Sequence, residues 1–398
     1  MATEYRKVTF KDITLELSDG LHAAPKFFSD GDYIFVNAKN LIDGRIVDID
    51  KEKRTTYEEY LKYKIDLNEN TILYSIDGTI GNVAKYRGEK VVLGKGACYL
   101  KLRPGIDTDY IYFYLMSPQF SNYIKKMSTG STIRHISLKT MRTHSFNLPD
   151  TNTQKKISSI LLSIQNKIDT NNRINQNLEE LSKTIFKAWF IDKSPFGGKT
   201  PKEWLQTSLG KVCSCELGGT PSRSNPNYWN GRISWINSGE VNNFRIVKPT
   251  ETITELGLSK SATKLLPAKT TVIAITGATL GQVSLLEIDS CANQSVVGIV
   301  PNEKLPYEFI YPFINSNIQE LISNQTGGAQ QHINKQNVEE LSIVIPSSVT
   351  IKEYIGLVGG MYKTIANNCF ENESLVVLRD SLLPRLMSGE LDVSKIEL

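Results

Sequence analysis

The chain has 398 residues, too many for one ordinary hydrophobic core and enough for two or three domains. Hydrophobic residues make up 40% of the sequence and charged residues 22%, the balance of a soluble globular protein, and no apolar run is long enough to span a bilayer. Residues 1–7 lack the apolar stretch of a secretory signal, so we expect a cytoplasmic protein with no membrane partner.

Charge, histidines and cysteines narrow the class further. A net charge of +4 is compatible with nucleic-acid binding, although a free-standing DNA-binding protein is often more basic. The four histidines show no metal-ligand spacing, so no metal site is expected. The five scattered cysteines form no Cys-x-x-Cys pair and suit reduced thiols.

The first 150 residues mix short β-rich runs with Gly, Asn and Ser turns, which is typical of an α+β domain. Residues 72–76 predict a buried strand that ends at a glycine turn, and residues 100–102 predict another strand. Residues 110–114 predict the start of a short helix.

A long helix is predicted from Thr153 to Trp189, with no Pro or Gly inside it. Its apolar residues repeat about every 3.5 positions, the spacing of a coiled coil. They are Ile157, Ile160, Leu161, Ile164, Ile168, Ile174, Leu178, Leu181, Ile185 and Trp189. Thr151 or Asn152 is available to cap its first turn.

The second half repeats this plan. Residues 272–275 and 296–300 predict strands, and residues 309–314 predict a short helix. A second long helix is predicted from Thr350 to Met387, with Ser348 or Thr350 as its cap. Its apolar residues are Tyr354, Leu357, Val358, Met361, Ile365, Leu375, Leu378, Leu382 and Leu386.

An ordered series of internal matches links the two halves. Residues 71–83 match residues 271–283, with Thr79 and Gly81 recurring as Thr279 and Gly281. Further matches at the same spacing of 200 pair Asn37 with Asn237 and Arg45 with Arg245. Later the spacing becomes 197, which pairs His135 with His332 and Pro149 with Pro346.

The repeat predicts an α+β fold with two tandem domains separated by two long antiparallel coiled-coil helices. The predicted domains are residues 1–150 and 192–347, with helices at 151–191 and 348–398. About 38 residues at 1.5 Å each give a rod of about 57 Å. Antiparallel pairing would relate the domains by a pseudo-two-fold axis, a symmetry that duplex DNA shares.

The layout and several motifs resemble the specificity subunit of type I restriction-modification enzymes, and the resemblance covers the whole chain. Residues 216–221 (Glu-Leu-Gly-Gly-Thr-Pro) with residues 227–236 resemble the first motif of the family's target-recognition domain. Residues 201–204 with 209–212 resemble the segment before it. Residues 276–281 and 330–333 resemble the central strand-turn and the late recognition loop. Residues 19–26 of the first half lack Gly-Gly-Thr-Pro, so residue roles carry over less securely there.

The resemblance implies a non-catalytic DNA-binding subunit that recognises a bipartite target with a fixed gap. It implies two modification (methyltransferase) subunits, restriction (translocase-nuclease) subunits and double-stranded DNA as partners. The partners would methylate adenine on each strand. No cofactor is expected on this chain, whereas S-adenosylmethionine, ATP and Mg would bind the partner subunits.

Two other classes of function remain open: a self-contained DNA methyltransferase or nuclease, and a coiled-coil adaptor that binds no DNA. Residues 225–228 (Asn-Pro-Asn-Tyr) are one residue away from an adenine-methyltransferase signature. No glycine-rich cofactor strand lies upstream, so a surface turn is favoured. The acidic residues are dispersed, and no catalytic residue is expected.

Base recognition requires hydrogen-bond donors and acceptors on loops. A solvated or turn-capping role is the alternative for each candidate. The candidates in the first domain are Lys26, Asn37, Lys39, Asn40, Arg45, Ser75, Thr79, Lys95, Thr132, Arg134 and His135. Those in the second are Thr220, Arg223, Asn225, Asn237, Ser238, Glu240, Thr276, Thr279, Asn293, Gln294, Gln330, Gln331 and His332.

The apolar rhythm of each helix is broken once, at Asn171 and at Asn368, which are 197 positions apart. Both lie near the midpoint of their helix, where antiparallel helices meet. We therefore expect Asn171 and Asn368 to approach each other and to fix the register of the coiled coil.

Overall fold

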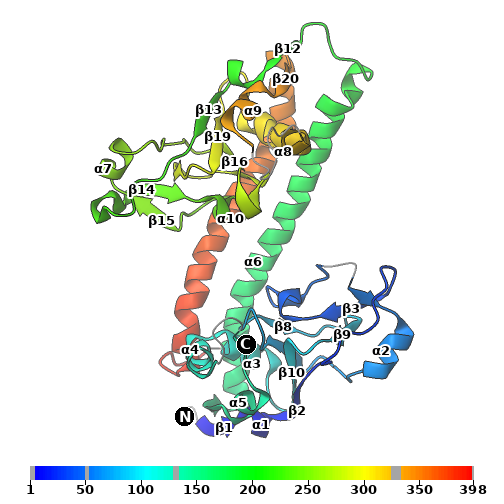
Figure 1. Ribbon diagram of the computed structural model, residues 1–398. Helices are drawn as coiled ribbons and strands as arrows, with labels where there is room; N and C mark the ends of the chain where they lie inside the picture. Colours follow the sequence, from blue (N-terminus) through cyan, green and yellow to red (C-terminus); the bar gives the residue numbers. More distant parts are fainter. Residues whose placement is uncertain (1–4, 50–52, 129–133, 324–332, 397–398) are drawn as a thin grey trace. The chain divides into compact units, whose positions relative to one another are not determined.

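The computed structural model of the protein describes residues 5–49, 53–128, 134–323 and 333–396 (Figure 1). The chain divides into two compact units. Unit 1 comprises residues 1–167 and 375–398, and unit 2 comprises residues 168–374. The domain bounds predicted from the sequence stay a prediction. No helix formed by the described residues is long and apolar enough to cross a membrane.

Unit 1 is built from short strands and helices before the first long helix. Its strands are β1 Tyr5–Thr9, β2 Thr14–Asp19, β3 Tyr33–Val36, β4 Leu41–Ile42, β5 Arg45–Ile46, β6 Arg54–Thr55, β7 Thr71–Ser75, β8 Val83–Lys85, β9 Val91–Leu93, β10 Ala97–Leu102 and β11 Ser145–Pro149. Its short helices are α1 Phe10–Ile13, η1 Ala38–Asn40, α2 Tyr57–Tyr63, α3 Thr108–Met116, α4 Pro118–Met127 and α5 Leu138–Thr143.

Unit 2 uses the same kinds of element. Its strands are β12 Leu205–Ser208, β13 Ser214–Leu217, β14 Trp229–Ile236, β15 Glu251–Ile253, β16 Thr271–Ala274, β17 Val283–Leu285, β18 Cys291–Ala292, β19 Val296–Val300 and β20 Ser342–Ile345. Its short helices are η3 Ser194–Phe196, η4 Leu209–Lys211, η5 Pro226–Tyr228, η6 Ser238–Asn242, α7 Glu255–Ser259, η7 Gly277–Thr279, α8 Tyr307–Ser323 and α9 Lys335–Glu340.

Three sheets of unit 1 have counterparts of the same topology in unit 2, and the short pair β4-β5 is found in unit 1 alone among the described residues. The four-stranded sheet β2-β10-β7-β8 of unit 1 corresponds to β13-β19-β16-β17 of unit 2. The three-stranded sheet β6-β3-β9 corresponds to β15-β14-β18, and the pair β1-β11 to β12-β20. The predicted α+β class and the internal repeat are thus confirmed, and the strands predicted from buried apolar runs are present.

The two long helices are α6 (Thr151–Phe186, followed by the π-helical turn η2 Lys187–Ile191) and α10 (Ser348–Met387). Their caps lie one residue earlier than the nearest predicted one. The Asp150 carboxylate accepts from the Thr153 amide at 3.0 Å, and the Ser347 hydroxyl accepts from the Thr350 amide at 3.2 Å. Helix α8 is longer than predicted, because it continues through Pro312.

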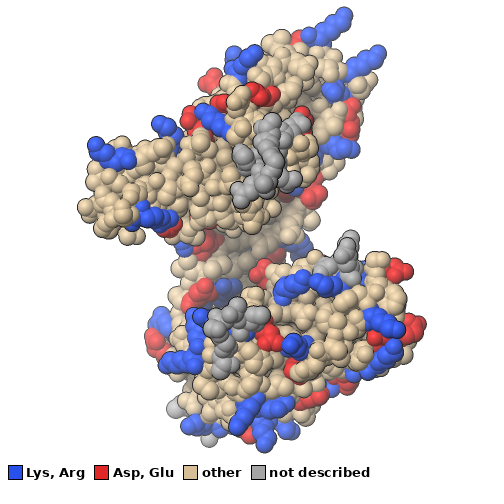
Figure 2. All heavy atoms as spheres, in the orientation of Figure 1, with Lys and Arg blue, Asp and Glu red and all other residues tan. Residues whose placement is uncertain are grey.

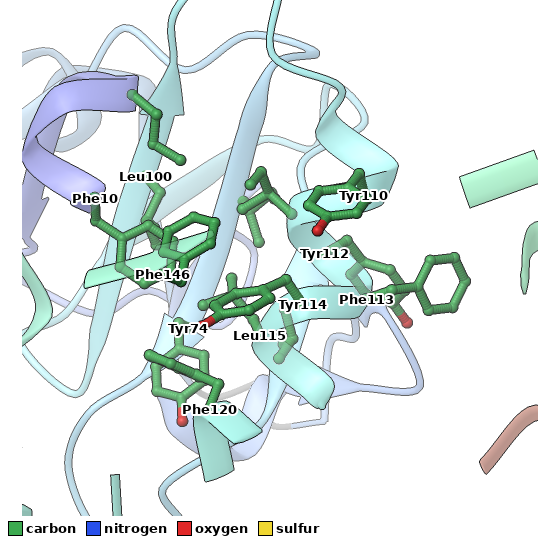
Figure 3. Close-up of a cluster of buried hydrophobic side chains, with 14 of the residues drawn as sticks. Phe10, Tyr74, Leu100, Tyr110, Tyr112, Phe113, Tyr114, Leu115, Phe120 and Phe146 are labelled. Atoms are coloured by element: carbon green, nitrogen blue, oxygen red, sulfur yellow. The ribbon is translucent and has the colours of Figure 1, made fainter. Parts of the chain in front are cut away.

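The core of unit 1 is closed by both long helices. Figure 3 shows its centre, where aromatic side chains from α1, α3 and α4 meet residues of the four-stranded sheet. Ile157 and Leu161 of α6, together with Leu383 and Leu386 of α10, belong to the same core. The long helices are therefore part of the domain's interior.

The core of unit 2 is closed in the same way. Phe186 of α6 contacts Phe309 with a ring-centroid distance of 5.5 Å, and Tyr354 and Tyr362 of α10 are buried in the same core. The apolar stripe predicted for α6 is wrong in this region, because Ile174 and Leu181 are 39% and 47% exposed. The buried positions of α6 are instead polar: Asn171, Asn175, Glu179 and Ser182.

Asparagine contacts join α6 and α10 within unit 2. Asn171 Nδ2 donates to Asn372 Oδ1 at 2.9 Å and to Glu371 at 2.7 Å, whereas Asn368 Nδ2 donates to Asn175 Oδ1 at 2.8 Å. The helices run antiparallel, because the α10 partner changes from Asn372 to Asn368 as the α6 residue changes from Asn171 to Asn175. The predicted contact between Asn171 and Asn368 is wrong by one helical turn, since each bonds an asparagine four residues from the other.

His144, which precedes β11, is buried among aromatic rings in the core of unit 1. Its Nε2 lies 2.8 Å from the Tyr114 hydroxyl, and its ring packs against Tyr123 with a centroid distance of 4.2 Å. Burial lowers the pKa of His144 to about 4, because a charged imidazole would lose its hydration there. The side chain is therefore neutral in the folded protein near neutral pH.

A pH-dependent stability of unit 1 follows. The unfolded chain takes up a proton at His144 near pH 6.5 and the folded chain only near pH 4, so stability falls as the pH drops through this window. Between pH 7 and pH 5 the loss from this residue should be on the order of 2 kcal/mol. Urea unfolding of His144→Gln should show a shallower pH dependence than the parent. Equal slopes for His144→Gln and the parent would contradict the assignment.

Candidate nucleic-acid interface

One edge of unit 2 is formed by loops that follow the strand ends. Asn293, which follows β18, donates its amide to the carbonyl of Ile236 at the end of β14 (3.0 Å). The Ile275 amide donates to Ser295 (2.9 Å), and the Ile333 amide donates to Ile275 (3.0 Å). These bonds bring the segments after β14, β16 and β18 and the segment at Ile333 to one place.

The corresponding edge of unit 1 is formed by the same backbone bonds. The Gly94 amide donates to Val36 (2.8 Å), the Ile76 amide to Gly96 (3.0 Å) and the Ile136 amide to Ile76 (3.0 Å). We call these loop clusters edge 1 and edge 2. Edge 1 comprises residues 20–22, 37–40, 76–81, 94–96 and 134–136, and edge 2 comprises residues 218–220, 237–240, 276–281, 293–295 and 333.

A glycine is required at the start of each edge. A Cβ atom on Gly20 would lie 2.1 Å from the carbonyl oxygen of Leu93, and one on Gly218 would lie 2.1 Å from that of Asn293. Both contacts are with backbone, which cannot move aside without opening the edge. Gly218 belongs to the Gly-Gly-Thr-Pro motif, so this part of the motif has a structural role.

Several predicted residues are exposed on the edges. On edge 1, Lys39, Thr79, Lys95, Arg134 and His135 are exposed, and His135 Nδ1 lies 2.5 Å from Asp77 Oδ1. On edge 2 the exposed side chains are Thr220 and Gln294, and the half-exposed ones are Asn237, Ser238, Thr276, Thr279 and Asn293. Thr220 donates to Gln294 Oε1 at 2.5 Å, which joins two loops.

Other candidates are engaged inside the loops and shape them. Ser75 is fully buried and donates to the Thr79 carbonyl at 2.6 Å, and buried Asn40 donates to Val47 at 3.0 Å. Buried Glu240 accepts from the Asn237 amide at 2.9 Å. These three are corrected from candidate base contacts to loop supports, because their polar groups already have partners.

The remaining candidates lie outside the edges, cap short helices or are not described. Lys26 and Arg45 are exposed outside edge 1, and Asn37, half-exposed on it, caps η1. Asn225 caps the turn η5, and the Arg223 guanidinium stacks 3.6 Å from the Trp229 ring centroid while it binds Glu251. Thr132, Gln330, Gln331 and His332 lie outside the described residues.

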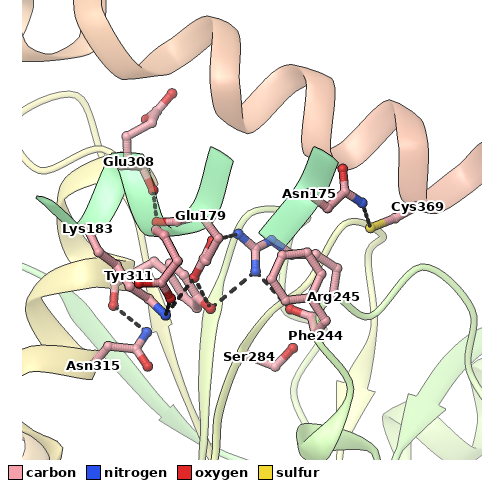
Figure 4. A network of polar contacts seen from close by, with 12 residues as sticks. Asn175, Glu179, Lys183, Phe244, Arg245, Ser284, Glu308, Tyr311, Asn315 and Cys369 are labelled. Atoms are coloured by element: carbon pink, nitrogen blue, oxygen red, sulfur yellow. Dashed lines mark hydrogen bonds and ion pairs between the residues drawn. The ribbon is translucent and has the colours of Figure 1, made fainter. Parts of the chain in front are cut away.

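The sequence did not reveal a buried ionic network in unit 2 (Figure 4). Arg245, whose side chain is fully buried, donates to Glu179 of α6 at 2.7 Å and to the Tyr311 hydroxyl at 3.1 Å. Tyr311 in turn donates to Glu179 at 3.0 Å. Arg245 was visible only as a repeat match to Arg45, and the spacing along the chain gives no sign that it meets Glu179.

A second carboxylate completes the network. Glu287 lies 3.7 Å from Arg245 Nε and also binds Lys269. Burial raises the pKa of Glu287, and the nearby Lys269 and Arg245 oppose that shift. Lys183 lies 3.6 Å from Glu179, so two carboxylates meet three cations, and the network joins α6 to the loop before β15 that supports edge 2.

Removing one carboxylate should destabilise unit 2 strongly. Glu179→Leu leaves Arg245 buried with reduced compensation, which should cost about 3–5 kcal/mol in free energy of unfolding. The double variant Glu179→Leu/Arg245→Leu should recover most of this loss, because it removes the buried charge. Glu180→Leu, whose parent side chain is 78% exposed, is the matched control and should change stability by less than about 1 kcal/mol. Urea unfolding of the full chain measures all three, and no difference between the two single variants would refute the role of the network.

The family model for the type I restriction modification DNA specificity domain matches the chain twice, at residues 20–180 and 201–355. The chain belongs to this family. Each match includes one complete edge, so the edges are a feature of the two specificity domains. The specificity subunit is the non-catalytic member of a type I restriction system, as the sequence predicted.

Named relatives and one solved structure agree with this membership. The type I restriction enzyme HindI specificity subunit of Haemophilus influenzae is 26% identical over 357 residues, 71% of this chain and 77% of the relative. The MjaIX specificity subunit of Methanocaldococcus jannaschii is 24% identical over 385 residues, 92% and 88% of the two chains. The crystal structure of a type I S subunit from M. genitalium is similar in fold, with a TM-score of 0.62, 17% identity and coverage of 97% and 96%.

Proposed function

We propose that this specificity subunit reads a bipartite, gapped DNA target, with one edge for each half-site. The observation that carries the proposal is that the same backbone hydrogen bonds build a loop edge twice in one chain. Because backbone bonds hold these loops, the loop conformation does not depend on which side chains the loops carry. Such loops suit base recognition, which needs varied donors and acceptors on a fixed frame.

The two edges carry different chemistry, so we expect different half-sites. Lys95 of edge 1 stands where edge 2 has Gln294, as the equivalent bonds of Gly94 and Asn293 show. A lysine favours guanine oxygens or phosphate, whereas a glutamine amide pairs with adenine. Thr79 and Thr279 are common to both edges.

We also propose that α6 and α10 form an antiparallel coiled coil with pseudo-two-fold symmetry, which sets the gap between the half-sites. Its support is the asparagine pairing in unit 2. The pair Asn171–Asn372 becomes Asn368–Asn175 when each residue is shifted by the repeat spacing of 197. Polar residues at a helix seam fix register, because a slipped register leaves them unpaired.

The proposed partners are two modification subunits and the restriction subunits that join them. Leu181 of α6 and Leu378 of α10 are equivalent in the repeat, and their side chains are 47% and 45% exposed. Equivalent apolar positions suit two copies of one partner. The modification subunits would bring S-adenosylmethionine for adenine methylation, and the restriction subunits ATP and Mg. We place the assembly in the cytoplasm.

A domain exchange tests the proposed function. Residues 1–150 are replaced by the first recognition domain of another specificity subunit, and Leu383 and Leu386 are changed to the donor's residues, because they complete that core. Mapping methylated adenines in cells with the partner subunits should show one changed half-site and one unchanged. Replacing residues 192–347 should give the reciprocal result. A change in both half-sites after either exchange would refute separate reading by the two edges.

Changing the asparagines tests the register. Leucine at Asn171, Asn175, Asn368 and Asn372 together should keep or raise thermal stability but permit methylation at more than one gap length. Asn171→Leu/Asn368→Leu alone should cost about 1–3 kcal/mol, because it leaves buried Asn175 without its Asn368 donor. Asn367→Leu, at an exposed neighbouring position, is the control. One sharp gap length in the fourfold variant would contradict the proposal.

A further inference from the structure

A pocket of about 660 Å³ lies in unit 1 away from edge 1. It is bordered by the start of β2, by α1, by α5 and by the turn after β10. Figure 2 shows Lys and Arg side chains over the part of unit 1 that Figure 1 labels α1, β2 and α5. Four of the lining side chains are cations: Lys11, Arg103, Lys139 and Arg142.

The charge of these cations is only partly compensated: after the larger effect of its hydrogen bonds with Thr9, the nearby charges of Lys11 and Arg103 lower the pKa of the Asp12 carboxyl. None of the four forms an ion pair with any residue that the structure describes. The single carboxylate that lines the pocket, Glu16, accepts a hydrogen bond from the Tyr99 hydroxyl at 2.5 Å. The neighbouring Asp12 is bound to Thr9, whose amide and hydroxyl donate to it at 2.8 and 2.7 Å. The pocket thus has an excess of positive charge.

One cation is held in place by the domain itself. Arg142 Nε and Nη2 donate to the Leu17 carbonyl at 3.1 and 2.6 Å, which fixes the plane of the guanidinium and leaves Nη1 available. Lys11, Lys139 and Arg103 are exposed around it. A guanidinium held in one orientation, with exposed cations around it, can bind the oxygens of a phosphate group.

The repeat shows that this charge is specific to unit 1. The amides of Phe10 and Leu209 donate to equivalent carbonyls, of His144 and Leu341, so the two regions can be aligned. The positions equivalent to the four cations are occupied in unit 2 by Gly210, Asn302, Gln336 and Glu339. The shared fold therefore does not require these cations.

We propose that this pocket binds phosphate groups, either of free polyphosphate or nucleotide or of the DNA backbone beyond the first half-site. Binding of the DNA backbone rests on the proposed function, whereas binding of free polyphosphate or nucleotide does not. In both cases the ligand would neutralise Arg103, Lys139, Lys11 and the free edge of Arg142. A charge present in one unit would make the two repeated units chemically distinct.

The test uses the variant Arg103→Asn/Lys139→Gln, which introduces the residues found in unit 2 and leaves Arg142 intact. The control is Lys64→Gln/Lys90→Gln, which removes the same charge from exposed sites of unit 1 outside the pocket. Calorimetric titration of the full chain with inorganic tripolyphosphate, and separately with ATP, should show at least tenfold weaker binding for the pocket variant and no change for the control.

The second arm uses the complex assembled with its partner subunits. Duplexes carry the target with a long or a short flank outside the first half-site, and binding is measured across a salt series. If the DNA backbone is the ligand, the pocket variant should lower the slope of log affinity against log salt by about 1–2 on the long flank only. Loss of polyphosphate binding alone would identify the free source. If neither arm separates the pocket variant from the control, the proposal is wrong. Absence of sequence-selective binding on every duplex would instead refute the proposed function, which the tripolyphosphate arm does not use.

Discussion

Neither recognition domain can close its hydrophobic core without side chains from both long helices. In unit 1 the core takes Ile157 and Leu161 from α6 and Leu383 and Leu386 from α10, and in unit 2 it takes Phe186 from α6 and Tyr354 and Tyr362 from α10. Folding of each unit therefore requires the two helices to lie side by side in opposite directions. The helix pair is not a linker added to finished domains, because removing its apolar residues would open both cores to water.

The helices are held by different forces at different points. In unit 2 the buried face of α6 is polar, and Arg245, Glu179 and Tyr311 satisfy one another there. This network is not repeated among the residues that the structure describes in unit 1, where Arg45 is exposed and the α10 position equivalent to Glu179 is Val376. Buried ion pairs add little net stability, but separating their members is strongly destabilising because it leaves a buried charge without a partner. The network thus specifies the position of α6 in unit 2, whereas in unit 1 apolar packing is joined by a hydrogen bond from Arg379 of α10 to Gln165 of α6 at 2.7 Å.

The sequence predicted the features that depend on local patterns. The strands around residues 72–76 and 272–275, the two long helices and the repeat all follow from apolar spacing and recurring motifs. It failed where distant residues decide the outcome. The stripe through Ile174 and Leu181 has helical periodicity, yet a different face of α6 is buried. That face carries Glu179, which binds Arg245, 66 residues further along the chain. Asn171 and Asn368 were identified as seam residues, but the register that pairs them with Asn372 and Asn175 depends on packing in both cores.

The frame of each edge is made by the backbone, and this explains how one fold can carry two loop surfaces with different side chains. The bonds of Gly94 to β3 and of Asn293 to β14 use only amides and carbonyls, so the side chains on the loops are free to differ. The close approaches at Gly20, Gly218 and Gly219 restrict the residue type, because a Cβ there would strike backbone atoms, and the left-handed backbone of Gly78, Gly81, Gly277 and Gly281 favours glycine on the turns. The same reasoning applies to the pocket beside α5, where four cations in unit 1 are replaced by Gly, Asn, Gln and Glu in unit 2 without a change in topology. Selection can then alter what each half of the chain binds while the hydrogen bonds and cores that hold the fold remain unchanged.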